Sequence, residues 1–149
     1  MVTTWEQYTE VSNQCFELKQ QGKFAEQIPL QKKVIELAEP FGAKRVASAY
    51  AKLAHLYHQT QQYELAEDAS LTALNYHDDT EKHAEEHLGT LQFQLATILA
   101  AQERFDEAVK IGTQAIKNFA VLHEPPTNFL RAKISEVEKI RRFRNQKTK

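Results

Sequence analysis

The feature that most constrains this chain is a pattern of residues that occurs three times. Each copy is centred on an aromatic residue, and Phe24, Tyr63 and Phe105 follow one another at intervals of 39 and 42 residues. Nine positions before the aromatic lie Cys15, Ala54 and Ala96, and six positions before it lie Leu18, Tyr57 and Leu99. Three positions after it come Gln27, Ala66 and Ala108, and ten positions after it come Val34, Ala73 and Ala115. A register kept through three copies predicts three copies of one structural unit.

The spacing of these residues predicts that each unit is a pair of antiparallel helices. Small side chains at facing positions let two helices approach closely, and the aromatic residue at the turn fills the end of the gap between them. One such hairpin buries only part of its apolar surface, so neighbouring hairpins must stack on each other. Three copies are about the number that a stable stack requires.

The repeated residues resemble the tetratricopeptide repeat family over about residues 8–122. The resemblance is closest to the longer-period repeats of kinesin light chains and related bacterial proteins, and the segment GKFAEQIPLQKKVIEL carries it best. Pro29 stands where that subgroup often has a proline early in the second helix. The first copy is the weakest match, since Gln14, Gln27 and Gln31 replace residues that the family usually keeps apolar or small.

The resemblance implies an all-α fold, a right-handed solenoid of three helical hairpins closed by a C-terminal capping helix. We expect one domain over residues 1–149, with repeats at about 8–40, 47–78 and 89–122 and a capping helix at about 127–144. The hairpin helices are expected at 4–20, 25–38, 44–60, 63–76, 80–102 and 105–121. Pro29 is compatible with a helix if it lies in the first turn, where backbone N–H groups have no acceptor.

Composition narrows the classes of protein further. Apolar residues make up 42% of the chain and charged residues 26%, which is typical of a globular domain. Four Gly and four Pro are too few for the many turns of a β-sandwich or barrel. We expect neither a signal peptide nor a membrane span, and a single Cys allows no internal disulfide, so the predicted location is the cytoplasm.

Charge is unevenly distributed along the chain. Residues 126–149 contain eight Lys and Arg against two Glu, although the net charge of the whole chain is −1. The candidate basic patch consists of Arg141, Arg142, Arg144 and Lys147. It could bind nucleic acid, or it could bind the acidic body of a second copy and form a homodimer.

The sequence offers two weak candidates for chemistry. His83 and His87 in the string HAEEH have the spacing at which two imidazoles on one helix can share a metal, but a solvated helix start explains them better. Cys15 occupies the small packing position of its repeat, so we expect it to be buried rather than nucleophilic. We therefore expect no enzymatic activity, no metal and no cofactor.

The binding surface is expected on the first helix of each hairpin. The resemblance places two rows of residues on a concave groove, namely Asn13, Lys52 and Gln94, and then Phe16, His55 and Thr97. A polar row of this kind can hydrogen-bond the backbone of an extended peptide. The carboxylate clamp of some family members is absent, because only Lys52 is cationic among the matching positions.

These residues predict a non-catalytic adaptor or scaffold that holds a peptide or helix of a protein partner in the groove. A dedicated chaperone for a secreted protein is an alternative that would use the same groove. A nucleic-acid-associated protein acting through the basic C-terminal segment is an alternative from another class.

Overall fold

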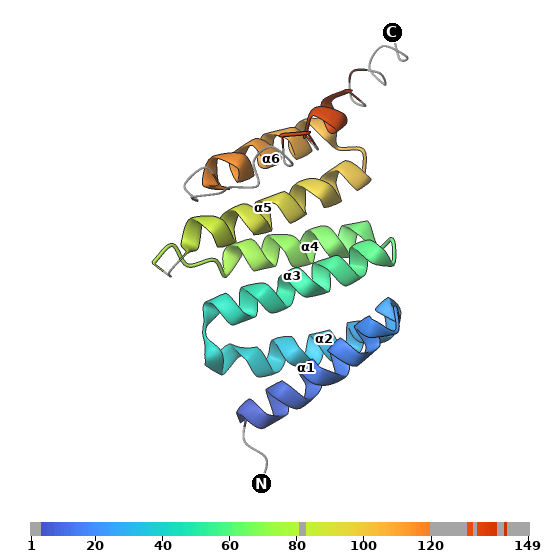
Figure 1. The fold of residues 1–149 in the computed structure, drawn as a ribbon, viewed down its shortest axis with the longest axis vertical. Helices are drawn as coiled ribbons and strands as arrows, with labels where there is room; N and C mark the ends of the chain where they lie inside the picture. The colour runs from blue at the N-terminus through green and yellow to red at the C-terminus, as the bar shows by residue number, and fades with distance from the viewer. Residues whose placement is uncertain (1–3, 81–82, 120–130, 133, 140–141, 143–149) are drawn as a thin grey trace. The chain divides into compact units, whose positions relative to one another are not determined.

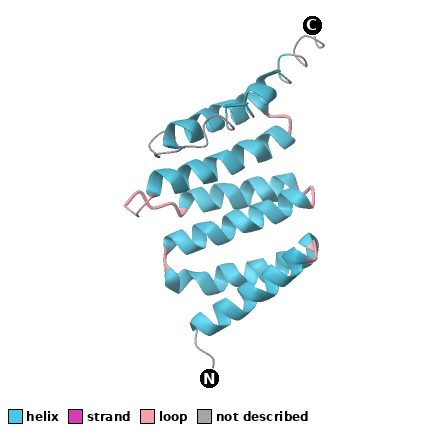
Figure 2. Ribbon diagram, in the orientation of Figure 1, coloured by secondary structure: helices cyan, strands magenta, loops and turns pink. Residues whose placement is uncertain are grey.

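The computed structural model describes residues 4–80, 83–119, 131–132, 134–139 and 142, and it divides after Asp78 into two compact units. The first unit contains α1 (Thr4–Gln20), α2 (Phe24–Ala38), the short 3-10 helix η1 (Glu39–Phe41), α3 (Ala43–Gln59) and α4 (Tyr63–Asn75). The second unit contains α5 (Ala84–Ala101) and α6 (Phe105–Phe119) (Figure 1). Figure 2 shows helices joined by short loops, with no strand in the described part of the chain. The prediction of an all-α helical repeat is confirmed.

The helices form three antiparallel hairpins, α1–α2, α3–α4 and α5–α6, and within the first unit α2 also packs against α3. Residues at the repeated positions are buried throughout: Cys15, Ala54, Ala96, Tyr57, Leu99, Gln27, Ala66, Ala108, Val34, Ala73 and Ala115. Leu18 and the three turn aromatics are half-buried. The register predicted from the sequence is therefore the register of the core.

The three hairpin turns have the same backbone. In each turn the residue two positions before the aromatic has a positive φ, which is 70° at Gly22, 62° at Gln61 and 64° at Glu103. In each turn the next N–H donates to the carbonyl five residues earlier, from Lys23 to Leu18 (3.0 Å), from Gln62 to Tyr57 (2.8 Å) and from Arg104 to Leu99 (3.0 Å). A left-handed residue with this hydrogen bond is the usual way to end a helix and reverse the chain.

Two glutamines that depart from the family pattern are part of the core of the first unit. Gln31 is buried on α2, and its Nε2 donates a hydrogen bond of 3.0 Å to the backbone carbonyl of Ala49 on α3. Gln27 is also buried and donates to the carbonyl of Lys23, at 3.4 Å. Since a buried amide without a partner is costly, the bond from Gln31 explains how a polar residue is accommodated between two hairpins.

The expected position of Pro29 is wrong. The ring lies at the sixth residue of α2 and on its exposed side, so it is beyond the first turn. Proline has no N–H and cannot donate to the carbonyl of Ala25. The helix continues to Ala38 because buried residues on its other side, such as Val34, hold it against its neighbours.

The predicted start of the fifth helix is also wrong. The sequence predicts a helix from about residue 80, whereas α5 begins at Ala84. His83 precedes it with a φ of 62°, and a left-handed residue cannot belong to a right-handed helix. Thr80 and His83 are therefore not part of α5.

Two glycines in the second unit mark places where side chains approach a helix backbone closely. A Cβ added to Gly89 would lie 3.1 Å from the ring of Phe119, and one added to Gly112 would lie 2.9 Å from the end of the Ile134 side chain. Ile134 belongs to the predicted capping helix, of which residues 131–132, 134–139 and 142 are described and helical. Its side chain packs on α6.

The core register gives a first prediction. Replacing Ala108 by Leu should lower the free energy of unfolding by about 1–3 kcal/mol, because Ala108 is buried between α5 and α6 and extra volume would force the helices apart. Ala101→Leu is the control, because Ala101 is exposed at the end of α5. Thermal unfolding followed by circular dichroism would compare the two variants, and equal shifts of the midpoint would contradict the register.

The shared turn gives a second prediction. Gln61→Gly and Glu103→Gly should each raise the free energy of unfolding by about 0.5–1 kcal/mol, because glycine adopts a positive φ without steric strain. Lys110→Gly is the control: it places glycine at an exposed position inside α6 and should lower stability by about 1 kcal/mol. Urea unfolding would measure all three, and destabilisation at Gln61 and Glu103 would argue against the left-handed turn.

Candidate functional site

Four of the predicted groove residues lie on the first unit and are exposed. Asn13 and Phe16 are on α1, and Lys52 and His55 are on α3. Among the residues that the structure describes, Phe16 is the most exposed large apolar side chain, with 59% of its surface accessible. We call these four residues, with their surroundings on the two helices, the α1–α3 face.

Interactions across the two helices place these residues near one another. Cys15, which lies between Asn13 and Phe16, packs with Ala49 of α3, and its thiol is close enough to Lys52 for their electrostatic interaction to affect it. At the other end, Lys19 of α1 acts electrostatically on His55 of α3. The α1–α3 face is therefore a continuous surface of the first unit.

Helix α3 is unusual in its charge. Its sequence AKRVASAYAKLAHLYHQ contains Lys44, Arg45, Lys52 and two His but no Asp or Glu. Seven buried residues, from Val46 to Tyr57, occupy about half of its circumference. Its exposed residues include Arg45, Lys52, His55 and Gln59, which recur at helical spacing and form one stripe. The part of α3 that faces solvent beside α1 is thus cationic and polar.

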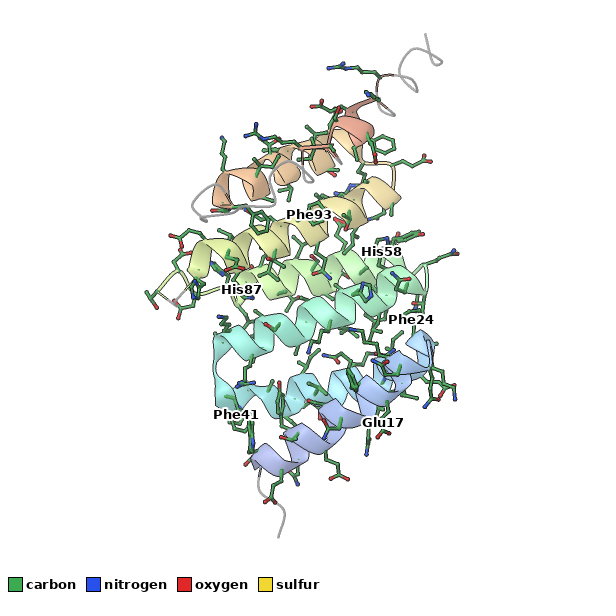
Figure 3. The ribbon with its side chains drawn as sticks, viewed as in Figure 1. Glu17, Phe24, Phe41, His58, His87 and Phe93 are labelled. Carbon is green, nitrogen blue, oxygen red and sulfur yellow. The ribbon has the colours of Figure 1, made fainter. Side chains whose placement is uncertain are left out.

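His55 lies at the end of the α1–α3 face, next to the first hairpin turn. Its ring meets the ring of Phe24 edge to face, with centroids 6.3 Å apart, and His58 meets Tyr63 in the same way at 5.7 Å. Phe24 and His58 lie at the turn end, whereas Phe41 lies at the opposite end of the first hairpin (Figure 3). Although His55 is exposed overall, the loss of water around its ring lowers its pKa, and the nearby His58 and Lys19 lower it further.

Cys15 is not arranged as a nucleophile. The residue is buried against Val34 and Ala49, with Tyr8 and Val11 packed around them. Burial raises the pKa of its thiol, and the positive charge of Lys52 offsets only part of this effect. A buried thiol with a raised pKa is mostly protonated and reacts slowly. The predicted packing role of Cys15 agrees with this environment.

His83 and His87 do not share one helical face, because His83 lies before α5 and has a left-handed backbone. In the described ranges, no group of three His, Cys, Asp or Glu side chains comes together in a way that could hold a metal ion.

The remaining groove residues lie on the second unit. Gln94 and Thr97 are half-buried on α5, and the hydroxyl of Thr97 donates to the carbonyl of Gln94 at 2.7 Å. Near them, Gln92 joins α5 to α6, because its Nε2 donates to Gln114 at 3.3 Å and its Oε1 accepts from Asn118 at 2.6 Å. The placement of Gln94 and Thr97 in one row with Asn13 and Lys52 stays a prediction.

The basic patch lies mostly outside the described residues. Arg142 is helical and exposed, whereas Arg141, Arg144 and Lys147 are not among the residues that the structure describes.

An aromatic cluster that was not predicted from the sequence lies at the start of the α1–α3 face. Trp5 and Tyr8 of α1 stack with ring centroids 5.5 Å apart, and Phe41 of η1 lies 5.1 Å from Trp5. The guanidinium of Arg45 lies over this cluster, 5.1 Å from the Trp5 ring centroid and 5.9 Å from that of Tyr8. The sequence does carry a signal, since Arg45 precedes Lys52 by seven residues and so shares its stripe.

The environment of His55 predicts how stability depends on pH. The folded state holds the pKa of His55 below 6.5, so between that lowered value and 6.5 the unfolded chain binds more protons than the folded one. The folded state therefore has its full stability at neutral pH. It loses stability as the pH falls through 6.5, because protonation of His55 favours the unfolded chain. Between pH 7.5 and pH 5.5, the thermal midpoint of the native protein should fall by more than that of His55→Gln. Equal falls, or a smaller fall in the native protein, would contradict the lowered pKa.

None of the described helices combines the length and the apolar composition that crossing a membrane requires.

Comparison with known proteins agrees with this architecture. Residues 47–76, which span most of α3 and all of α4, match the family model described as a tetratricopeptide repeat. Among solved structures, the chain is similar to the crystal structure of BtubC (BKLC) from P. vanneervenii, with a TM-score of 0.63 and 22% sequence identity. That likeness covers 76% of this chain and 46% of BtubC, so this chain matches less than half of that protein. A search of the curated proteins gave no match.

The matched repeat coincides with the α3–α4 hairpin, and the same register and turn recur in the other two hairpins. Residues 47–76 therefore match a tetratricopeptide repeat, and the chain has the all-α helical-repeat fold that is typical of such repeats.

Proposed function

We propose that the chain is a non-catalytic adaptor that binds a segment of a protein partner on the α1–α3 face of its first unit. Tetratricopeptide repeats generally mediate contacts between proteins, which supports this class of function. The observation that carries the proposal is the exposed stripe of α3, which has cations and amides but no acid and lies beside the exposed ring of Phe16.

The chemistry of the face suits an extended segment. Asn13 offers an amide that both donates and accepts, and Lys52 offers an ammonium group that donates to backbone carbonyls or to carboxylates. Phe16 is an apolar anchor that burial against a partner would stabilise, by about 1.5–3 kcal/mol for full burial. The three side chains together provide hydrogen bonds and one buried contact, which is the usual composition of a binding face.

The environment of the single cysteine is also compatible with a binding role. Cys15 is buried with a raised pKa, and the family is typically non-catalytic. We therefore assign the α1–α3 face to recognition alone.

The test compares two double variants of the same composition. Asn13→Ala with Lys52→Ala removes two groups of the α1–α3 face, and Asn75→Ala with Lys33→Ala removes the same residue types from exposed positions on α4 and α2. Proteins captured from native lysate would be quantified by mass spectrometry, and the Kd of a purified partner would be measured by calorimetry. We expect the first variant to lose about 1–4 kcal/mol of binding free energy, or about 5- to 1,000-fold in affinity, and the second to lose almost none.

Both variants should unfold at the midpoint of the native protein, since all four side chains are exposed. Equal losses of capture in the two variants would contradict the assignment of the face. Full capture by the first variant would move the proposed site elsewhere, and the basic patch of Arg141, Arg142, Arg144 and Lys147 would be tested next.

A further inference from the structure

Arg45 lies over an aromatic cluster at one end of the α1–α3 face. Its guanidinium lies over the rings of Trp5 and Tyr8, and the two rings are themselves stacked and supported by Phe41. A guanidinium over an aromatic face is attracted by the ring and loses much of its rotational freedom. Trp5 is nevertheless 48% exposed, so the cluster is a surface and not part of the core.

No described acidic side chain pairs with Arg45. The ion pairs Lys33–Glu36 and Arg104–Glu107 both lie away from α3. Helix α3 has no Asp or Glu of its own, and the neighbouring residue Lys44 is a second cation. An exposed arginine that is fixed by aromatic rings and lacks a carboxylate partner has its hydrogen-bonding capacity available for a ligand.

The geometry determines which ligand suits this position. The N–H groups of a guanidinium lie in its plane and point outward along its edge. That edge matches the two oxygens of a carboxylate, which it can bind through two parallel hydrogen bonds. Lys52, one stripe position further along α3, could meet a second carboxylate of the same extended segment.

We propose that Arg45, supported by Trp5 and Tyr8, is a carboxylate-binding subsite, and that the partner of the α1–α3 face is an acidic segment running from Arg45 toward Lys52. This inference rests on the proposed function and adds the chemical class of the partner. It also adds Arg45 and Trp5 as specificity-determining residues, neither of which belongs to the predicted groove rows.

Trp5 is the single Trp of the chain, so its fluorescence reports directly on this subsite. The full-length protein would be titrated, at physiological salt, with a fluorescein-labelled peptide of alternating Glu and Ser, and with the same peptide carrying Gln in place of Glu. Trp5 emission and fluorescein anisotropy would both be followed. We expect the Glu peptide to bind at least about tenfold more tightly than the Gln peptide and to change the Trp5 emission.

The decisive comparison is between substitutions at two neighbouring positions of α3. Arg45→Gln should weaken binding of the Glu peptide about tenfold, whereas Lys44→Gln, which removes the same charge one residue away, should weaken it about twofold. Trp5→Leu, followed by anisotropy alone, should weaken it as well, because it removes the ring that holds Arg45. Circular dichroism would confirm that each variant keeps the helical content of the native protein.

Three results would overturn the subsite. Equal losses in Arg45→Gln and Lys44→Gln would show a diffuse electrostatic effect, and a saturating Glu peptide that leaves Trp5 emission unchanged would show binding elsewhere. A single-stranded DNA oligonucleotide that binds as tightly as the Glu peptide, with the same dependence on Arg45, would show a site for phosphates rather than for an acidic peptide.

The experiments distinguish a failure of the proposed function from a failure of the carboxylate subsite. If a captured partner is lost with Asn13→Ala and Lys52→Ala but kept with Arg45→Gln, the α1–α3 face binds proteins and the carboxylate subsite is wrong. If the Glu peptide depends on Arg45 while capture does not depend on Asn13 and Lys52, the subsite holds and the wider face is wrong.

Discussion

The close approach of paired helices at alanine positions is the constraint on which each hairpin depends. Ala54, Ala66 and Ala73 have no exposed surface, and each places a single carbon between two helix backbones. A larger side chain at any of them would separate the helices and open gaps around its neighbours, since protein interiors are packed as densely as organic crystals. In the second unit Ala115 is also fully buried. At Gly112 the side chain of Ile134 lies so close to the helix backbone that even an added Cβ would contact it at 2.9 Å.

This dense packing also determines what remains for recognition. The buried residues of α3 occupy about half of its circumference, so a stripe on its other side reaches solvent. The side chains of that stripe lie outside the alanine-packed core, although Arg45 contacts the aromatic cluster and His55 contacts Phe24. On α3 these residues are cations, a histidine and an amide, and α1 adds an exposed phenylalanine and tryptophan. The chemistry of this surface can therefore change with less effect on stability than that of the core.

Most of the fold could be predicted because the repeat is periodic, and periodicity identifies helices and their buried sides. The failures occur where backbone conformation, rather than side-chain pattern, decides. The residue type of His83 does not indicate a positive φ, so the start of α5 that the sequence predicts is too early. Pro29 was placed in a first turn because a proline inside a helix is rare, yet packing by Val34 and its neighbours maintains α2 around it.

The candidate site was predictable to a smaller extent. The positions of Asn13, Phe16, Lys52 and His55 follow from counting back from the turn aromatics, and all four are exposed as counting suggests. Counting along one helix cannot show which side chains meet across two helices. The contact between Arg45 and Trp5 joins residues forty positions apart and depends on how α1 lies beside α3.

The three turns share one backbone, but the connections between hairpins do not share a length. Four residues link α2 to α3, whereas eight link α4 to α5, and this difference goes with the unequal intervals of 39 and 42 residues between the aromatics. One residue added to a turn would rotate the following helix by about 100° and carry its alanines away from their partners. The chain can therefore change length between hairpins but not within them. A change in the number of residues between α4 and α5 would leave the repeat register inside each hairpin unchanged.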